Sequence, residues 1–346
     1  MAIAGPAAAA LASLKPDQVT FLQSLEKAEL HAHLNGSIPI AVIQQLGKEY
    51  VNSPSSTRGD AIYATIERLI YSSELETIDD FFSVFPIIYH LTSTPESLAC
   101  ATRGVLNAFL DGDHPQCNYL ELRTGPRETE YMSRELYMRT VLNEAEKYGE
   151  KVGVILSLDR KTGKKTWQEC LDIALKLKGE GRRLVGVDLC GEPSMGDVAD
   201  FQTFFCEAKK AGLCVTLHIA EIISSTPEET LKLLSFQPDR LGHATFLNKE
   251  AMDTVIKNNV CVEICLTSNL LSKTVTALES HHIRQYLKEN HLIAICTDDI
   301  LPFRTSLLAE YALLLAQPPL GLGLTEDEVK GIGEMSLRAR FTMGSS

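Results

Sequence analysis

The sequence predicts an α/β fold of the closed (β/α)8, or TIM, barrel type, and three observations favour it. The chain contains eight short runs of β-forming residues, helix-like stretches separate these runs, and 346 residues suit one such barrel with insertions. Strands and helices that alternate eight times are typical of parallel strands closed into a barrel and covered by helices.

The eight predicted strands follow one another along the whole chain. They lie at residues 27–33 (KAELHAH), 118–123 (NYLELR), 152–159 (VGVILSLD), 184–189 (LVGVDL), 213–218 (LCVTLH), 240–243 (RLGH), 260–266 (VCVEICL) and 292–298 (LIAICTD). The middle runs are almost continuously apolar, as expected for parallel strands that are buried on both faces. Helical patterns lie between them, for example at 167–178 and 201–211.

The crossover after the first strand, from residue 33 to 118, is far longer than the others. It contains helix-like segments at 60–71 and 78–91, and an insertion at this place is expected to lie over the barrel mouth as a lid. Residues 1–20 are Ala-rich and lack the basic start and apolar run of a signal peptide. We expect 1–20 to be a disordered or weakly helical leader and 21–346 to form a single barrel domain.

Composition limits the partners. The net charge of −12 does not suit a nucleic-acid backbone, although one phosphate can still bind a local basic group. Nine cysteines without a C-x-x-C pair indicate reduced thiols and a reducing compartment. No run of about 18 apolar residues occurs, so we expect no membrane span. These features predict a cytoplasmic monomer that binds a small molecule and neither nucleic acid nor membrane.

Polar side chains stand where several of the predicted strands end. His31 and His33 end the first strand and point to one side of it, His218 ends the fifth and Asp298 ends the eighth. Catalytic groups of such barrels gather at the C-terminal face. Three imidazoles and a carboxylate suit Zn²⁺, which needs one further position for water. We therefore predict one zinc ion per chain, with these four residues as ligands.

Three further residues, Glu221, His243 and Asp299, are expected beside this metal. Hydrolytic removal of an amino group adds hydroxide to a ring carbon and requires a proton on the adjacent ring nitrogen. Glu221 can supply that proton if burial keeps its carboxyl protonated. His243 can orient the water or take its proton, and Asp299 can accept a hydrogen bond from the same water.

Each residue of this group, taken alone, has an ordinary structural explanation. A histidine that ends a strand is more often a hydrogen-bonded core residue than a ligand, and Asp-Asp after an apolar run is usually a helix start. The joint placement on four strands carries the prediction. The fourth strand ends without the lysine that bridges two metals in binuclear barrel hydrolases, which favours one metal. The H-x-E and P-C-x-x-C signature of cytidine-type deaminases is absent.

From about residue 25 to 341 the chain resembles the adenosine/AMP deaminase family. Six motifs occur in order: ELHAHLNGS (29–37), GVDLCGEP (186–193), TLHIAE (216–221), RLGHATFL (240–247), EICLTSN (263–269) and CTDD (296–299). The resemblance implies a TIM barrel of the metal-dependent hydrolase type and the same metal and catalytic roles for the residues named above. It also implies that the backbone of Gly191 donates to the purine ring.

Within the family the chain is similar to the adenosine deaminase-like branch, which acts on N6-methyl-AMP. Asn35 stands where adenosine deaminases proper carry Asp, and an amide there does not repel a 5′-phosphate. The branch uses the segment 119–127 (YLELRTGPR) for substrate, and Asp159 is expected to accept hydrogen bonds from ribose. The implied substrate contacts are His33, Asn35, Tyr89, Arg123, Thr124, Gly125, Pro126, Asp159, Gly191 and Asp299.

The chain departs from the branch at two places. The branch carries His where Tyr89 stands, and His90 follows one residue later, about 100° round a helix. Residues 300–303 (ILPF) replace the Gly-Val-Phe expected after the Asp pair, in a loop that is placed to touch an N6 substituent. Arg127 and Arg160 are as compatible with solvated loop charges as with substrate contacts.

The sequence thus predicts a zinc-dependent purine nucleotide aminohydrolase that converts N6-methyl-AMP and water to IMP and methylamine. The alternative is an adenosine or adenine deaminase, which would act without the 5′-phosphate. A relative without activity would have lost a ligand or Glu221, and neither is lost. A secreted signalling deaminase would need a signal peptide and paired cysteines.

Overall fold

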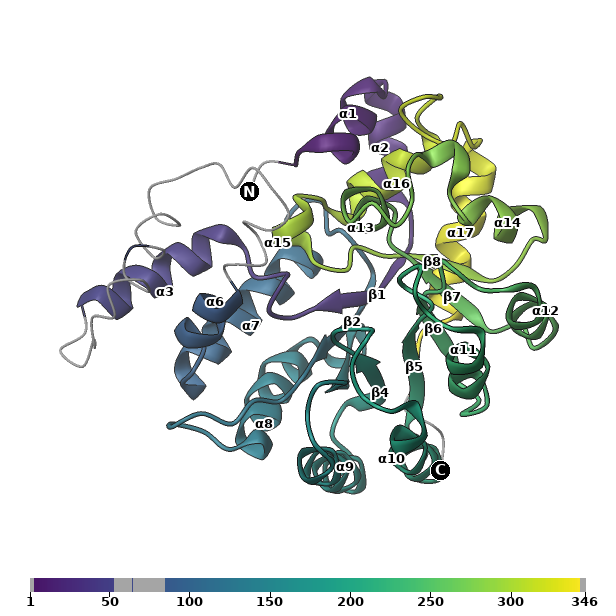
Figure 1. Cartoon of the computed structure of the whole chain (residues 1–346). Helices are drawn as coiled ribbons and strands as arrows, with labels where there is room; N and C mark the ends of the chain where they lie inside the picture. The colour runs from purple at the N-terminus through teal and green to yellow at the C-terminus, as the bar shows by residue number, and fades with distance from the viewer. Residues whose placement is uncertain (1–2, 53–63, 65–84, 343–346) are drawn as a thin grey trace.

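A computed structural model of the chain describes residues 3–52, 64 and 85–342. Eight parallel strands form one sheet in the order β1 to β8, as Figure 1 shows. Their bounds are Ala28–His33 (β1), Tyr119–Thr124 (β2), Val152–Asp159 (β3), Leu184–Cys190 (β4), Cys214–Ile219 (β5), Arg240–His243 (β6), Cys261–Ile264 (β7) and Ile293–Ile295 (β8). The predicted barrel is therefore confirmed.

The barrel closes between β1 and the segment that follows β8. A parallel bridge joins Ala32 to Asp298, the His33 N–H donates to the Asp298 carbonyl at 3.0 Å, and the Asp298 N–H donates to the His31 carbonyl at 2.8 Å. Strand β8 is shorter than predicted and ends at Ile295, and the chain turns at Asp298, where φ is +61°. The closure therefore lies at the level of the predicted metal ligands.

Helices surround the strands on the outside of the barrel (Figure 1). Between the strands and after them lie α3 (Ile40–Asn52), α6 (Phe85–Leu91), α7 (Pro95–Leu110), α8 (Arg134–Ala145), η1 (Glu146–Lys151), α9 (Lys164–Gly179), α10 (Val198–Lys210), α11 (Pro227–Leu234), α12 (Lys249–Lys257), α13 (Leu266–Leu271), η2 (Leu278–Ser280), α14 (Ile283–Lys288), α15 (Ile300–Phe303), α16 (Leu307–Leu315) and α17 (Glu326–Arg338). Within the described part of the chain, no helix has the length and hydropathy required to cross a bilayer.

The long first crossover contributes helices α3, α6 and α7. The predicted helix at 60–71 lies outside the described residues, and α6 covers only the end of the one predicted at 78–91. Leu46 and Tyr50 of α3 and Phe85 and Tyr89 of α6 line the cavity at the barrel mouth. The crossover thus reaches the place where a lid was expected.

The N-terminal segment is ordered, contrary to the expectation of a disordered or weakly helical leader over residues 1–20. It forms α1 (Gly5–Ser13) and α2 (Pro16–Ser24), and both pack against α16. Ala7 and Ala10 are fully buried in this contact. Alanine side chains are small enough for two helices to approach closely, so the Ala-rich stretch that suggested a leader instead forms a packing face.

One carboxyl of α16 is buried away from the barrel mouth and makes stability depend on pH. Glu310 accepts hydrogen bonds from the Thr267 N–H at 3.1 Å and from the Thr305 hydroxyl at 2.6 Å. Burial raises the pKa of Glu310 from 4.5 to about 7 despite these hydrogen bonds. The native state therefore holds this proton more tightly than the unfolded chain does, and the resulting stabilisation is complete below pH 4.5 and lost as the pH rises through about 7.

We expect Glu310→Gln, which stays neutral at every pH, to remove this dependence. Between pH 4.5 and 8 the free energy of unfolding of the wild type should fall relative to that of the variant by roughly 2–3 kcal/mol. Denaturant unfolding of both proteins at a series of pH values measures the difference. A difference that stays constant with pH would contradict the assignment.

Candidate active site

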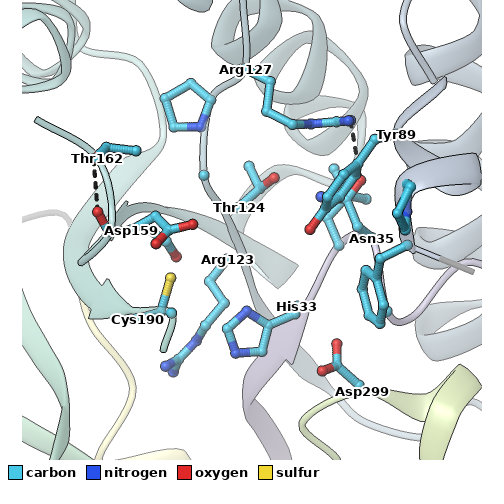
Figure 2. A pocket seen from close by; sticks show the side chains of 18 of the residues that line it. His33, Asn35, Tyr89, Arg123, Thr124, Arg127, Asp159, Thr162, Cys190 and Asp299 are labelled. Atoms are coloured by element: carbon cyan, nitrogen blue, oxygen red, sulfur yellow. Dashed lines mark hydrogen bonds between the residues drawn. The ribbon is translucent and has the colours of Figure 1, made fainter. Parts of the chain in front are cut away.

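A cavity of about 1490 Å³ opens at the C-terminal end of the barrel. All of the predicted substrate contacts line it, together with Glu221, His218, His243 and Asp298. His31 does not line it, because its side chain is fully buried beneath the cavity floor. Figure 2 shows that the labelled residues come from several strands and loops and surround one space.

The three predicted histidine ligands converge on one point. The Nε2 atom of His218 lies 3.1 Å from Nε2 of His31 and 3.2 Å from Nε2 of His33. The Asp298 Oδ1 atom lies 3.7 Å from Nε2 of His31 and 3.5 Å from Nε2 of His33. Two nitrogens that are each about 2.0–2.1 Å from a tetrahedral zinc lie roughly 3.3–3.4 Å apart. These separations therefore fit a shared metal ion.

The outer nitrogens of two of these rings have acceptors that fix the tautomer. His31 Nδ1 lies 2.6 Å from Glu263 Oε2, and His218 Nδ1 lies 2.9 Å from the Leu189 carbonyl and 3.0 Å from Asp188 Oδ1. A proton on each Nδ1 leaves a lone pair on Nε2, which then faces the lone pairs of the neighbouring rings. Such an arrangement is the usual support for metal-binding histidines. A cation at the centre relieves the repulsion.

The electrostatics of the site favour positive charge there. Burial lowers the pKa of His33 to about 3, so this ring is neutral and free to act as a ligand. Burial opposes a charge on His218, but the Asp188 carboxylate outweighs it and raises the pKa of His218 to about 9. The Asp188 carboxylate thus favours a positive charge on the His218 ring, which either a proton or a metal ion at Nε2 can supply. The residues present therefore fit the predicted metal.

The catalytic candidates border the ligand cluster. His243 Nε2 lies 3.7 Å from Glu221 Oε1 and 3.9 Å from Asp298 Oδ2, and His31, His243 and Asp298 are also close enough to share an ion. Glu221 keeps 30% of its side chain exposed, so its burial is less complete than expected. Burial and the neighbouring Asp298 charge raise the pKa of Asp299 well above its ordinary value.

Glycine and left-handed backbone shape this floor. A Cβ atom on Gly36 would lie 1.7 Å from Asp299 Oδ1, so the Asp299 carboxyl occupies the space that a side chain at position 36 would fill. Ala220, His243, Ala244 and Asp298 all have positive φ. Such strain in residues other than glycine is often found at functional sites.

Arg127 is partly exposed and lines the cavity, and it pairs with no carboxylate among the residues that the structure describes. Its Nη2 atom donates to the Thr92 hydroxyl at 2.9 Å and to Asn35 Oδ1 at 3.4 Å. Its guanidinium lies across the Tyr89 ring, 4.1 Å from the ring centre (Figure 2). Tyr89 rather than His90 therefore faces the cationic part of the cavity.

Arg123 has a structural role that the sequence did not indicate. Its guanidinium is fully buried, donates to Glu263 Oε2 at 2.8 Å and to the Leu30 carbonyl at 2.6 Å, and lies 3.5 Å from Asp188 Oδ1. The side chain thus holds the two carboxylates that orient His31 and His218, and because Arg123 also lines the cavity, its contact with substrate stays a prediction.

The opposite side of the cavity carries Asp159 and Gly191. Asp159 Oδ1 accepts from the Lys161 N–H at 3.0 Å, and a Cβ atom on Gly191 would lie 2.4 Å from this oxygen. With φ at +92°, Gly191 is a position that requires glycine. Arg160 is buried and pairs with Glu229 at 2.6 Å, so it stabilises this loop and does not reach the cavity.

Sequence reasoning missed the residues that support the ligands. Glu263 and Asp188 orient two rings, and the Ser268 hydroxyl donates to Asp298 Oδ2 at 2.8 Å. All three belong to motifs that were noted in the sequence (GVDLCGEP and EICLTSN), but their partners lie on other strands. The motifs indicated that these segments belong to the site, but only the fold shows which ligand each residue supports.

Comparisons with known proteins agree with this geometry. The model of the adenosine deaminase family matches residues 26–343. The N6-methyl-AMP deaminase of Bos taurus is 35% identical over 96% of this chain and 94% of its own. The apo structure of the Arabidopsis thaliana N6-methyl-AMP deaminase has a TM-score of 0.81 at 30% identity and covers 94% of both chains. Arabidopsis ADAL complexed with IMP has a TM-score of 0.80 at 31% identity, over 93% and 94%.

Proposed function

Because the chain belongs to the adenosine deaminase family, we propose that it hydrolyses the C6–N6 bond of a purine 5′-mononucleotide, with N6-methyl-AMP and water giving IMP and methylamine. Relatives from cow, human and zebrafish that are 33–35% identical over 93–96% of the chain bear the name N6-methyl-AMP deaminase. Their similarity extends through every strand that carries a site residue. This breadth supports a shared reaction.

We propose one zinc ion per chain, held by His31, His33, His218 and Asp298. When bound, zinc would lower the pKa of a water molecule towards ~7, so that hydroxide forms near neutral pH. The neutral rings of His31 and His33, and the carboxylates that orient His31 and His218, suit this metal better than Mg²⁺ or Ca²⁺, which prefer oxygen ligands.

Removal of the metal should lower the melting temperature, since an ion that binds only the folded protein stabilises it. We expect purified protein to hold close to one equivalent of zinc by elemental analysis, and a strong chelator to lower the melting temperature by roughly 5–10 °C. Readdition of zinc should reverse the change. Protein that holds far less than one equivalent and melts at the same temperature with and without chelator would contradict the site.

Three side chains are placed to move protons around C6 of the purine. Glu221 gives its proton to N1 of the ring as the water oxygen bonds to C6. His243 and Asp299 hold that water by hydrogen bonds, and His243 takes the proton it releases. The proton on His243 then passes to N6, the C6–N6 bond breaks as the C6 hydroxyl returns its proton to Glu221 and becomes the carbonyl of IMP, and methylamine leaves.

The observation that carries the choice of a nucleotide is Arg127. The Arg127 side chain lines the cavity, its guanidinium stacks on Tyr89, and it pairs with no carboxylate among the described residues. An Asp in place of Asn35 would lie beside Arg127 and neutralise it. The amide instead holds the guanidinium in place and leaves its charge for a phosphate. We therefore assign the 5′-phosphate to Arg127.

Replacement of Arg127 by Met keeps the stem over Tyr89 and removes the charge. We expect KM for N6-methyl-AMP to rise roughly 10- to 150-fold, which is the loss of affinity that corresponds to one hydrogen bond to a charged group. Turnover of adenosine, which lacks the phosphate, should change less than about threefold. Arg134→Met is the matched control, because Arg134 also lines the cavity but already pairs with Glu128 and Glu169. Equal losses for both substrates would show that Arg127 is structural.

A cytoplasmic location is part of the proposal. All nine cysteines are free thiols, which supports a reducing compartment. The monomeric state stays a prediction.

A further inference from the structure

His243 differs from the other histidines of the site in how its ring is oriented. His31 and His218 each have an acceptor at Nδ1, whereas His243 Nδ1 is buried and has no partner among the described residues. The His243 ring contacts the rings of His31 and His218, but no hydrogen bond at Nδ1 from the described residues fixes its tautomer. The direction of this ring therefore depends strongly on its backbone.

That backbone is strained. His243 and Ala244 have φ values of +62° and +48°, and neither is glycine. The Ala244 N–H donates to the Gly242 carbonyl at 2.8 Å, which closes a three-residue γ-turn around His243. Residues other than glycine rarely adopt positive φ, because the Cβ atom then crowds the backbone. Such conformations persist only where neighbouring groups hold them.

Two side chains hold this turn: His282, which directly precedes α14, and Tyr286, which lies within α14. His282 Nε2 lies 2.9 Å from the His243 carbonyl, and the Tyr286 hydroxyl donates to the Ala244 carbonyl at 3.4 Å. Because a carbonyl only accepts, the His282 ring carries its proton on Nε2. His281 stacks on His282 with ring centres 4.4 Å apart, and Tyr286 is fully buried. Each strained residue thus has its own donor.

We propose that His282, with Tyr286 as its auxiliary, is a positioning residue that aims the His243 ring at the reacting water by holding the His243–Ala244 turn. His282 touches neither the cavity nor the predicted metal ligands, so it acts only through His243. The inference rests on the proposed function for its effect on catalysis. The geometry that it describes exists without substrate.

The test compares His282→Ala with His282→Gln, whose amide can still donate to the His243 carbonyl. We expect His282→Ala to lower kcat roughly 10- to 100-fold, since small displacements of a catalytic group have effects of this size, with KM and zinc content nearly unchanged. His282→Gln should recover most of the loss. His291→Ala is the matched control, because His291 also bonds to a backbone carbonyl, that of Val260, at 2.8 Å, and it should keep the wild-type kcat.

A double-mutant cycle decides whether the effect passes through His243. In a His243→Ala background, His282→Ala should cause no further loss of kcat. A further loss of the same size, a His282→Gln protein as slow as His282→Ala, or a His282→Ala protein at the wild-type rate would overturn the proposal. If His282→Ala does not fold, the same cycle is run with Tyr286→Phe. We expect Tyr286→Phe to cause a smaller loss of kcat, and this loss should vanish in the His243→Ala background.

A measurement without substrate separates this proposal from the proposed function. Nitrogen-15 spectra of the histidine rings should show the His282 proton on Nε2, and the His243 signals should move in His282→Ala but not in His291→Ala. If the wild type deaminates no purine while these shifts occur, the function is wrong and the positioning stands. Unmoved His243 signals would overturn the positioning whatever the activity.

Discussion

Glu221→Gln should lower kcat by about 10³- to 10⁴-fold, near the upper end of what a single general acid contributes. An amide has almost the shape of the carboxyl but no acidic proton for N1 of the purine. The substitution should leave the ligand cluster intact, because Glu221 is not one of the four proposed ligands and borders them through His243, 3.7 Å away. KM and zinc content should therefore stay close to those of the wild type. Product formation under saturating substrate measures the loss.

A second carboxylate in the same cavity provides the control for Glu221. Glu192 lines the cavity and is exposed, so Glu192→Gln should reduce kcat by less than about threefold if the effect at Glu221 reflects proton transfer. A Glu221→Gln protein that keeps more than a tenth of the wild-type kcat would exclude Glu221 as the proton donor. Similar losses in the two variants would point to a general electrostatic effect of the cavity.

Gly36→Ala should lower kcat by about 100-fold, because the new methyl group and the Asp299 carboxyl cannot occupy the same space. The backbone at Gly36 cannot retreat easily, since its carbonyl accepts from the Leu301 N–H at 2.7 Å. Asp299 must therefore swing away from the water that it is proposed to hold. The loss should appear in kcat more than in KM.

Gly163→Ala is the matched substitution, because nothing lies within 4 Å of a Cβ atom placed there. It should keep the wild-type kcat, and both variants should bind zinc. A crystal structure of Gly36→Ala should show Asp299 in a different rotamer. Wild-type turnover by Gly36→Ala would mean that the position of Asp299 does not matter for the reaction.

The barrel itself could be predicted because each strand is a local pattern. The apolar runs at 152–159 and 240–243 match β3 and β6 residue for residue. Strand β8 is shorter than predicted, because the run continues to Asp298 while the strand ends at Ile295. Here the left-handed conformation of Asp298 overrides the apolar pattern. Composition also misled at the N-terminus, where alanines form a buried helix face against α16.

The cluster that we propose as the metal site could be predicted because a strand end fixes where a side chain must lie. His31, His33, His218 and Asp298 meet as expected, since the carboxyl ends of all eight strands share one rim. The second layer could not be predicted. Arg123 and Glu263 are 140 residues apart in the sequence, and no local pattern tells a buried ion pair from a substrate contact. The roles of Arg123 and His282 therefore emerge only from the fold.

The most direct test incubates the zinc-loaded protein separately with N6-methyl-AMP, AMP and adenosine and quantifies IMP or inosine by chromatography. We expect IMP to form fastest from N6-methyl-AMP, more slowly from AMP, and little inosine to form from adenosine, with Glu221→Gln inactive throughout. Faster formation of inosine from adenosine than of IMP from either nucleotide would contradict the assignment of Arg127 to a phosphate and favour a nucleoside deaminase.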